Sequence, residues 1–449
     1  MASAVVFAYS CILLSTNIKA LTPILQALIM SAPFVASPVS LLLSLPLADR
    51  IGRRPTMAIG LIVLVVGSVI SSVPGYYLVT IAGRVIGGLA LGLLTVVTVV
   101  YTSELQGAGI EEDGVRWMTF YSVLGILLVY CVKAINYRNS QLAMLAPIVP
   151  ACLSFIAGLF LLPESPRWLF AMERNEKAEK TLDMLGIVSK STSDANMESL
   201  DSWSDLSKSK HKYPLIKTVL VYAVLELISF SYILLPRYII DTDSTNQGIK
   251  GNLIMLFCFA LPHVITSSLI LWFANKRVKR WLWMGLCGYA LILLITSILF
   301  AVDGFTKARL NHNLIIAFLS LTSLSSSIVF PVLPWLYAWR SMPPTIKGRG
   351  WAITRAAGHA CNLVLLFLFP LMNNPLLVNK SIKPAFLTSI YGVSALVAML
   401  LIVYLRHDDD DGASPVEQIQ AIHRIPVDPN ARDALDLHPV KTPMPPPTP

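Results

Sequence analysis

The sequence predicts an all-α membrane protein built from two six-helix bundles, with about twelve transmembrane helices. Apolar residues make up 55% of the chain and charged residues only 14%, whereas charged residues form about a quarter of a typical soluble domain. Many apolar runs also reach the roughly 20 residues that a membrane helix needs. Finally, similar basic loops occur in both halves of the chain, which indicates an internal duplication.

The predicted transmembrane helices follow one another almost to the C-terminal tail. The first is short or incomplete, and it lacks the basic n-region of a cleaved signal peptide. The twelve segments lie near residues 2–16, 22–47, 56–73, 76–102, 117–135, 141–162, 214–235, 252–273, 282–301, 313–338, 350–371 and 384–405.

Lysine and arginine are concentrated in alternate loops between these segments. The loops that share this feature hold Arg50, Arg53 and Arg54; Arg116; Lys276 to Arg280; and Lys347 with Arg349. Because positively charged loops stay in the cytoplasm, we expect these loops and both chain termini on the cytoplasmic side. The localisation expected from this pattern is a multi-pass protein of the plasma membrane, in direct contact with the lipid bilayer.

A long polar segment, 163–213, separates the first six predicted spans from the last six. Within it, Glu173/Lys177 and Glu176/Lys180 have the i,i+4 spacing of a surface helix. The tail is acidic and then rich in proline, which is typical of disorder. The predicted organisation is therefore an N-terminal helix bundle (1–162), a cytoplasmic central loop (163–213), a C-terminal helix bundle (214–405) and a disordered cytoplasmic tail (406–449).

Several classes of function are disfavoured. The formal charge of +9 is carried by loops between apolar spans, so it indicates membrane topology and no nucleic-acid partner. The six cysteines all lie in apolar stretches without a paired spacing, which predicts neither a disulfide framework nor a metal site. We find no phosphate-binding loop, metal-ligand spacing or nucleophile motif. We therefore expect no enzyme activity and no cofactor.

Two pairs of motifs recur at nearly the same distance along the chain. Asp49-Arg-Ile-Gly-Arg-Arg-Pro55 has a partner in Asn275-Lys-Arg-Val-Lys-Arg280, at an offset of 226 residues. Tyr101-Thr-Ser-Glu104 has a partner in Tyr337-Ala-Trp-Arg340, at an offset of 236 residues. Two related six-helix halves are typical of carriers for small solutes.

These motifs resemble the major facilitator superfamily. Asp49 to Arg54 is similar to its signature loop between helices two and three. Gly83-Arg84-x-x-Gly87, Tyr101-x-Ser103-Glu104 and Pro163-Glu-Ser-Pro-Arg-Trp-Leu169 resemble the branch that holds sugar porters and organic-ion transporters. The resemblance implies the major facilitator fold and secondary transport by alternating access.

The charged residues of this loop and its neighbours are expected to form a latch that holds the inner gate shut. Partly buried ion pairs suit such a two-state element, because breaking them leaves unpaired charges. The alternative is that they only set topology and cap helices. The gating candidates are Asp49, Arg50, Gly52, Arg53, Arg54, Glu104, Arg116, Glu164 and Arg167.

The resemblance leaves the substrate open. The sugar branch is supported by Tyr101-x-Ser-Glu104 and by Trp335, at the position of that branch's pocket-side tryptophan. However, Leu225-Glu226 occupies the place of its paired glutamines. The organic-ion branch is supported by Gly251-Asn252 and by a helix eleven with ionisable residues. We give an organic ion first place, a sugar or polyol second, and keep a non-transporting carrier or receptor as a further alternative.

Ionisable residues inside predicted spans are functional candidates by default, because they are costly in lipid. Arg355 and His359 lie four residues apart, on one helix face with Trp351 and Asn362, and Glu226 lies midway along helix seven. Each also has a structural interpretation: Glu226 paired with Arg355 or His359, and His359 as a neutral histidine bonded to a neighbouring helix. A coupling ion, H⁺ or Na⁺, is left open. The candidate substrate-binding residues are Glu226, Tyr232, Trp335, Arg355, His359 and Tyr121.

Overall fold

The residues that the computed structural model describes form helices without any strand. The chain divides into two compact units, Met1–Met399 and Leu400–Pro449, and every contact given below lies within the first. The described residues are 22–73, 75–106, 120–121, 124–125, 127–132, 134, 142–185, 203–229, 234, 249–273, 278–306, 312–330, 333–343, 346–372 and 383–406.

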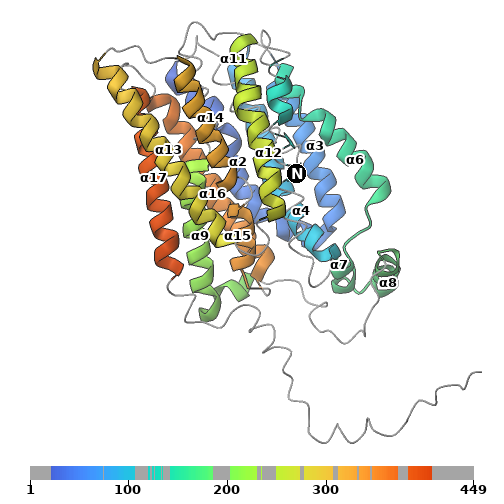
Figure 1. Cartoon of the computed structure of the whole chain (residues 1–449). Helices are drawn as coiled ribbons and strands as arrows, with labels where there is room; N and C mark the ends of the chain where they lie inside the picture. Colours follow the sequence, from blue (N-terminus) through green and yellow to red (C-terminus); the bar gives the residue numbers. More distant parts are fainter. Residues whose placement is uncertain are drawn as a thin grey trace, which may run out of the picture. The chain divides into compact units, whose positions relative to one another are not determined.

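The first half of the described chain contains three long apolar helices and several short ones (Figure 1). Their order matches the predicted spans from the second onward, while the first predicted span, 2–16, lies outside the described residues. They are α2 (Pro23–Ile51), α3 (Arg53–Ser71), α4 (Tyr77–Gln106), η1 (Leu142–Leu145) and α6 (Ile148–Leu161), followed by α7 (Pro166–Ala171) and α8 (Asn175–Met184).

The second half begins with the short helix η2 and continues to α17. It includes a π-helical turn, η4, between α11 and α12. The elements are η2 (Trp203–Ser207), α9 (Ser209–Ser229), α11 (Ile249–Ile254), η4 (Met255–Ala260), α12 (Leu261–Phe273), α13 (Val278–Thr306), α14 (His312–Val329), α15 (Leu333–Ser341), α16 (Lys347–Met372) and α17 (Lys383–Arg406).

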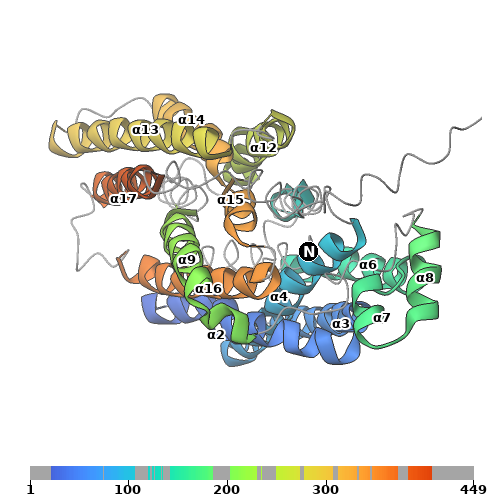
Figure 2. The same ribbon diagram turned by 90° about the horizontal axis from the view of Figure 1, so that it is seen from below.

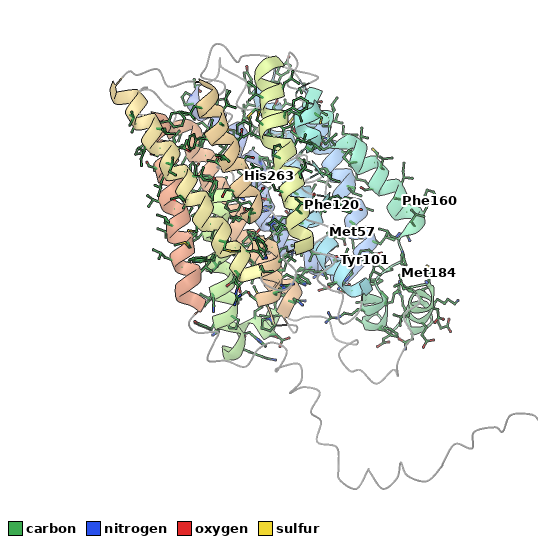
Figure 3. All side chains as sticks on the ribbon, viewed as in Figure 1. Met57, Tyr101, Phe120, Phe160, Met184 and His263 are labelled. Carbon is green, nitrogen blue, oxygen red and sulfur yellow. The ribbon has the colours of Figure 1, made fainter. Side chains whose placement is uncertain are left out.

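Seven of the described helical segments are long and apolar enough to cross a membrane. The twelve predicted spans cannot all be compared with them, because much of 117–135 is also outside the described residues. The outer surfaces of these helices carry many large apolar side chains. Phe160 of α6, for example, is 82% exposed (Figure 3). In water such a surface would aggregate, so it indicates contact with lipid.

Helix α2 packs against α4 within the first half and against α16 of the second half. Figure 2 shows α16 lying between α2 and α9. Two glycines permit the close approach of α2 and α4. A Cβ atom added at Gly88 would lie 2.1 Å from the carbonyl oxygen of Pro33, and one at Gly92 only 1.9 Å from Ser40 Oγ. Small residues at such crossings are typical of membrane helix packing.

The polar central segment forms short helices: α7 contacts α4 of the first half, and η2 contacts α9 and α16 of the second. Helices α7 and α8 pack on each other through Trp168, Leu169 and Ala178. The expected surface helix is present as α8, which contains Lys177 and the pair Glu176/Lys180. Glu173 was wrongly placed in it, because its φ of 58° puts it in the turn before α8.

Candidate functional site

A buried ion pair joins α9 and α16 in the interior of the helix packing. Glu226 and Arg355 are 8% and 6% exposed, and the distance from Arg355 Nη1 to Glu226 Oε1 is 3.0 Å. Glu226 is also the only aspartate or glutamate within the twelve predicted spans. An intramembrane charge pair of this kind is costly unless it is well satisfied, and it is therefore a candidate functional site.

The Glu226 carboxylate accepts hydrogen bonds from four donors. Oε1 accepts from Arg355 and from the Tyr222 hydroxyl, and Oε2 accepts from Asn362 Nδ2 at 2.8 Å and Ser229 Oγ at 3.1 Å. An ionised carboxylate has acceptor sites on both oxygens for all four donors, and its charge balances that of the guanidinium. Glu226 is therefore the ionised partner of Arg355, and the structural interpretation made from sequence, a pair between the two, is what the structure contains.

His359 connects this pair to α2. Its Nε2 lies 3.0 Å from Arg355 Nη2, and its Nδ1 lies 2.9 Å from the hydroxyl of Ser37. A guanidinium can only donate, so Nε2 must be the acceptor. We therefore assign the single imidazole proton to Nδ1, which donates to Ser37. His359 is thus a neutral histidine bonded to a neighbouring helix, and its ring also packs edge-on against Phe34.

Aromatic rings surround the guanidinium of Arg355. Its central carbon lies 4.5 Å from the centroid of Trp335, 5.4 Å from Tyr222 and 5.9 Å from Trp351. Cations are attracted to the faces of such rings, most strongly to tryptophan. Arg355 therefore does not reach toward a helix end, as expected for a snorkelling side chain, but is held in place by Glu226, His359 and three rings.

We call these residues the buried cluster: Ser37, Tyr222, Glu226, Ser229, Trp335, Trp351, Arg355, His359 and Asn362. Sequence reasoning placed Trp351, Arg355, His359 and Asn362 on one face of a helix but missed Ser37, Tyr222 and Ser229. Tyr222 and Ser229 are four residues before and three after Glu226, which is a detectable helical spacing. Ser37 carries no comparable signal, because its role depends on α2 packing against α16.

A second group of charges lies where α2 meets α3. The guanidinium of Arg53 binds Glu104 with two bonds, at 2.8 and 2.9 Å, and its Nη1 lies 3.0 Å from Asp49 Oδ1. The side chain of Arg53 is almost fully buried. Such bidentate pairs are geometrically specific. We call Asp49, Arg53, Glu104, Glu164 and Arg349 the loop network.

The Glu164 carboxylate caps the beginning of α3. It accepts from the backbone N–H of Arg53 at 3.0 Å and from that of Arg54 at 3.3 Å, where a helix has unpaired donors and a positive dipole end. Gly52, with φ of 104°, makes this possible, because an added Cβ atom would lie 2.5 Å from Glu164 Oε2. The bonds between this loop and Glu164 are thus made by the backbone of Arg53 and Arg54.

Asp49 connects the loop network to the second half of the chain. Its Oδ2 lies 3.1 Å from Nη2 of Arg349, at the beginning of α16. Arg349 in turn lies over the ring of Trp203 in η2, at 5.1 Å from the centroid. The Asp49 carbonyl accepts from the indole of Trp168. The carboxylate of Asp49 thus contacts both halves, and its backbone carbonyl contacts the central segment.

The side chains of the remaining predicted residues have other surroundings or lie outside the described residues. Arg50 is exposed, Arg167 is half-buried, and Arg54 donates to the carbonyls of Gly158 and Leu159 in α6. Tyr121 is 50% exposed and packs edge-on against Phe120, which Figure 3 labels. Arg116 and Tyr232 are outside the described residues.

Comparison with known proteins gives a consistent result over most of the chain. A family model described as "Sugar (and other) transporter" matches residues 1–407. The chain is 23% identical over 341 residues to the sugar transporter ERD6-like 6 of Arabidopsis thaliana. The aligned region covers 72% of this chain and 69% of that protein. The chain is 24% identical over 348 residues to the facilitated trehalose transporter Tret1 of Drosophila pseudoobscura pseudoobscura, of which the match spans only 38%.

The fold is also similar to that of a solved structure. The proton:xylose symporter XylE of the major facilitator superfamily, bound to 6-bromo-6-deoxy-D-glucose, aligns with a TM-score of 0.70. The sequence identity is 20%, and the alignment covers 90% of this chain and 93% of that one. The expected major facilitator fold is thereby confirmed.

Proposed function

Because the chain belongs to the sugar (and other) transporter family of the major facilitator superfamily, we propose that it moves a neutral sugar or polyol across a membrane by alternating access. It is a multi-pass membrane protein and a transporter, not an enzyme. The kind of solute, the membrane and the orientation are parts of the proposal, and we place the protein in the plasma membrane with both termini cytoplasmic.

One observation carries the choice of a neutral solute: the charges of the buried cluster cancel. Glu226 is paired with Arg355 at 3.0 Å, and His359 accepts from Arg355 and is neutral. A site for an organic ion needs an uncompensated charge of the opposite sign, because the ion loses its hydration inside the bundle. Among the described residues of the cluster, no such charge remains.

Neutral groups next to the ion pair are suited to a sugar. Asn362 is 3% exposed, its Nδ2 donates to Glu226, and its Oδ1 has no partner in the part of the chain that the structure describes. A buried acceptor without a donor is unfavourable, and a sugar hydroxyl would satisfy it. Trp335 offers an aromatic ring, at the position of the pocket-side tryptophan of the sugar branch.

The loop network is suited to close the cytoplasmic side. The pair between Asp49 and Arg349 joins α2 to α16, which belong to different predicted halves. If the halves rock apart at that end, this pair must break, while the contacts of Arg53 with Glu104 remain within the first half. We infer that Asp49–Arg349 is the part of the latch that opens.

The sugar reading replaces the organic ion as first choice. The sequence argument for an organic ion depended partly on the ionisable residues of helix eleven. Of these, Arg355 is paired with Glu226, and His359 accepts from Arg355. The named relatives are described as transporters of sugar, trehalose and xylose. The sequence alternative, a sugar or polyol carrier, therefore has the better support.

Uptake into proteoliposomes of the purified chain tests the proposal. The solutes are labelled D-glucose, D-xylose and trehalose, with tetraethylammonium and p-aminohippurate as an organic cation and an organic anion. We expect at least one sugar to enter faster than into protein-free liposomes, and neither ion to do so. Uptake of an ion alone would restore the organic-ion reading, and uptake of none by correctly folded protein would favour a non-transporting carrier.

A further inference from the structure

We propose that Trp203 is a positioning residue of the latch: its ring holds the guanidinium of Arg349 in the orientation that binds Asp49, and so sets how readily this end of the protein opens. The inference rests on the proposed alternating access and extends it, because it assigns part of the control of the Asp49–Arg349 contact to the central segment. It stands on the two groups that hold Arg349 and on the packing of η2.

Two groups hold the guanidinium of Arg349. Its Nη2 lies 3.1 Å from Asp49 Oδ2, and its central carbon lies 5.1 Å from the centroid of the Trp203 ring. The second distance is within the roughly 6 Å over which an aromatic face attracts a cation. Both contacts are present together, so the ring supports the ion pair and does not compete with it.

Helix η2 is attached to the second half, which also carries Arg349. Leu206 of η2 is buried against Met342 and Ile346, which lie between α15 and α16, and η2 contacts both α9 and α16. Trp203, three residues before Leu206, is 36% exposed and covers Arg349. We therefore expect Trp203 to stay with Arg349 when the halves part, whereas Asp49 leaves with α2.

A ring that stays with Arg349 lowers the cost of forming the ion pair again. A long side chain loses conformational entropy when its guanidinium is fixed. The ring already restricts the guanidinium before Asp49 returns, and a partner that is preorganised binds more strongly. Removal of the ring should therefore weaken the pair and favour the open state. As a scale, an exposed contact between a cation and an aromatic ring corresponds to roughly two- to fivefold in an equilibrium.

The central segment also contacts the other partner of this ion pair. The indole of Trp168, in α7, donates to the Asp49 carbonyl at 2.9 Å, and α7 contacts α4 of the first half. Two tryptophans of one segment thus contact the two residues of one ion pair, Trp168 from the first half and Trp203 from the second. This arrangement makes the central segment part of the latch on both sides.

Hydrogen exchange in a double-mutant cycle tests the inference without any sugar. The full chain is compared in four forms: wild type, Trp203→Ala, Arg349→Ala and the double variant. If Trp203 acts through Arg349, Trp203→Ala makes exchange at the adjoining ends of α2 and α16 roughly two- to fivefold faster. In the Arg349→Ala background, it should then have no further effect. A purely structural role predicts the same acceleration in both backgrounds.

Trp283→Ala is the matched control, because Trp283 is a similarly exposed tryptophan, at 41%, near the start of α13. Exchange at the ends of α2 and α16 should be unchanged in this variant. The proposal would be overturned if Trp203→Ala accelerates exchange equally in both backgrounds or in neither, or if Trp283→Ala accelerates it as much. Unchanged exchange in Arg349→Ala would overturn it too, because the ion pair would then not hold this end closed.

Two milder variants keep the proposal open to refutation if Trp203→Ala does not fold. Trp203→Tyr keeps an aromatic face, whereas Trp203→Leu keeps apolar volume without one. We expect exchange close to that of wild type in Trp203→Tyr and faster exchange in Trp203→Leu. Equal exchange in the two variants would show that the ring does not act as an aromatic partner of Arg349, and would overturn the proposal.

The result can be distinguished from that of the proposed function. Counterflow in proteoliposomes, in which labelled sugar exchanges for internal sugar, measures transport by itself. Wild type without counterflow would reject sugar transport, whereas the mutant cycle would still decide whether Trp203 positions Arg349. Wild type with counterflow, together with equal effects of Trp203→Ala in both backgrounds, would reject the inference and leave sugar transport intact.

Discussion

Asp49 and Arg349 are 300 positions apart in the sequence, and their side chains form an ion pair 3.1 Å long at the junction of α2 and α16. Both are largely buried, at 20% and 11% side-chain exposure. A contact between the predicted halves at this place must break if that end opens, so its strength sets how often opening occurs.

Arg349→Ala should therefore favour the state that is open at this end. A charged hydrogen bond contributes about 1.5–3 kcal/mol, which corresponds to a shift of roughly ten- to hundredfold in the equilibrium. Hydrogen exchange of the backbone amides measures this shift toward the open state. Exchange should become faster in the adjoining ends of α2 and α16. Arg280→Ala, an exposed arginine at the start of α13, is the control. Equal exchange in both variants would show that the pair does not hold this end closed.

Gly52→Ala should destabilise the protein for two reasons. The φ of 104° is unfavourable for alanine, and the added Cβ atom would lie 2.5 Å from the carboxylate that caps α3. Backbone strain alone amounts to about 1–3 kcal/mol. Gly75→Ala separates the two effects, because Gly75 has φ of 85° and nothing lies within 4 Å of its added Cβ. We expect Gly52→Ala to lower the thermal unfolding temperature in detergent more than Gly75→Ala does; equal decreases would exclude a role for Glu164.

Removing one charge of the buried pair should be worse than removing both. Breaking a buried pair from one side leaves an uncompensated charge and is destabilising by about 3–5 kcal/mol, whereas replacement of both partners is often neutral. Glu226→Gln and Arg355→Gln should each lower the amount of folded protein, and the double variant should recover part of it. Fluorescence-detected size-exclusion chromatography measures this. A double variant no better than the worse single one would mean that the two charges do not act as a pair.

Trp335→Phe should raise the sugar concentration needed for half-maximal uptake. The smaller ring offers less stacking surface to a sugar. For comparison, a nucleic-acid base stacked on an aromatic side chain contributes about 1–3 kcal/mol. Trp339→Phe is the matched control, since Trp339 is buried one turn further along α15 and packs against Trp351. If Trp339→Phe raises that concentration as much as Trp335→Phe, the effect comes from packing.

Much of the fold was predictable because membrane helices follow a simple rule. Apolar length marks the spans, and the residues from Asp49 to Arg54 and from Pro163 to Leu169 are distinctive motifs. The same motifs predicted that charges would gather near α3. The particular contacts were not predictable, such as backbone capping by Glu164, because they depend on how a loop 111 residues away folds back.

Only part of the buried cluster could be predicted from the sequence. Spacing on a single helix grouped Arg355 with His359, and an intramembrane acid drew attention to Glu226. Which charge pairs with which depends on helix rotation and crossing, which a sequence does not specify. The organic-ion preference counted the ionisable residues of helix eleven in its favour, whereas the pair at 3.0 Å between Glu226 and Arg355 favours a neutral solute.

Competition among three versions of one sugar tests the central claim most directly. Uptake of the best labelled sugar into proteoliposomes is measured with increasing amounts of the unlabelled sugar, its amino analogue and its uronic acid; for glucose these are glucosamine and glucuronate. The three share a ring and differ in charge. The charge-neutral cluster predicts that the neutral sugar competes best and that both charged analogues compete at least about tenfold more weakly, a difference of 1.4 kcal/mol. A charged analogue that competes as well as the neutral sugar, or better, would contradict it.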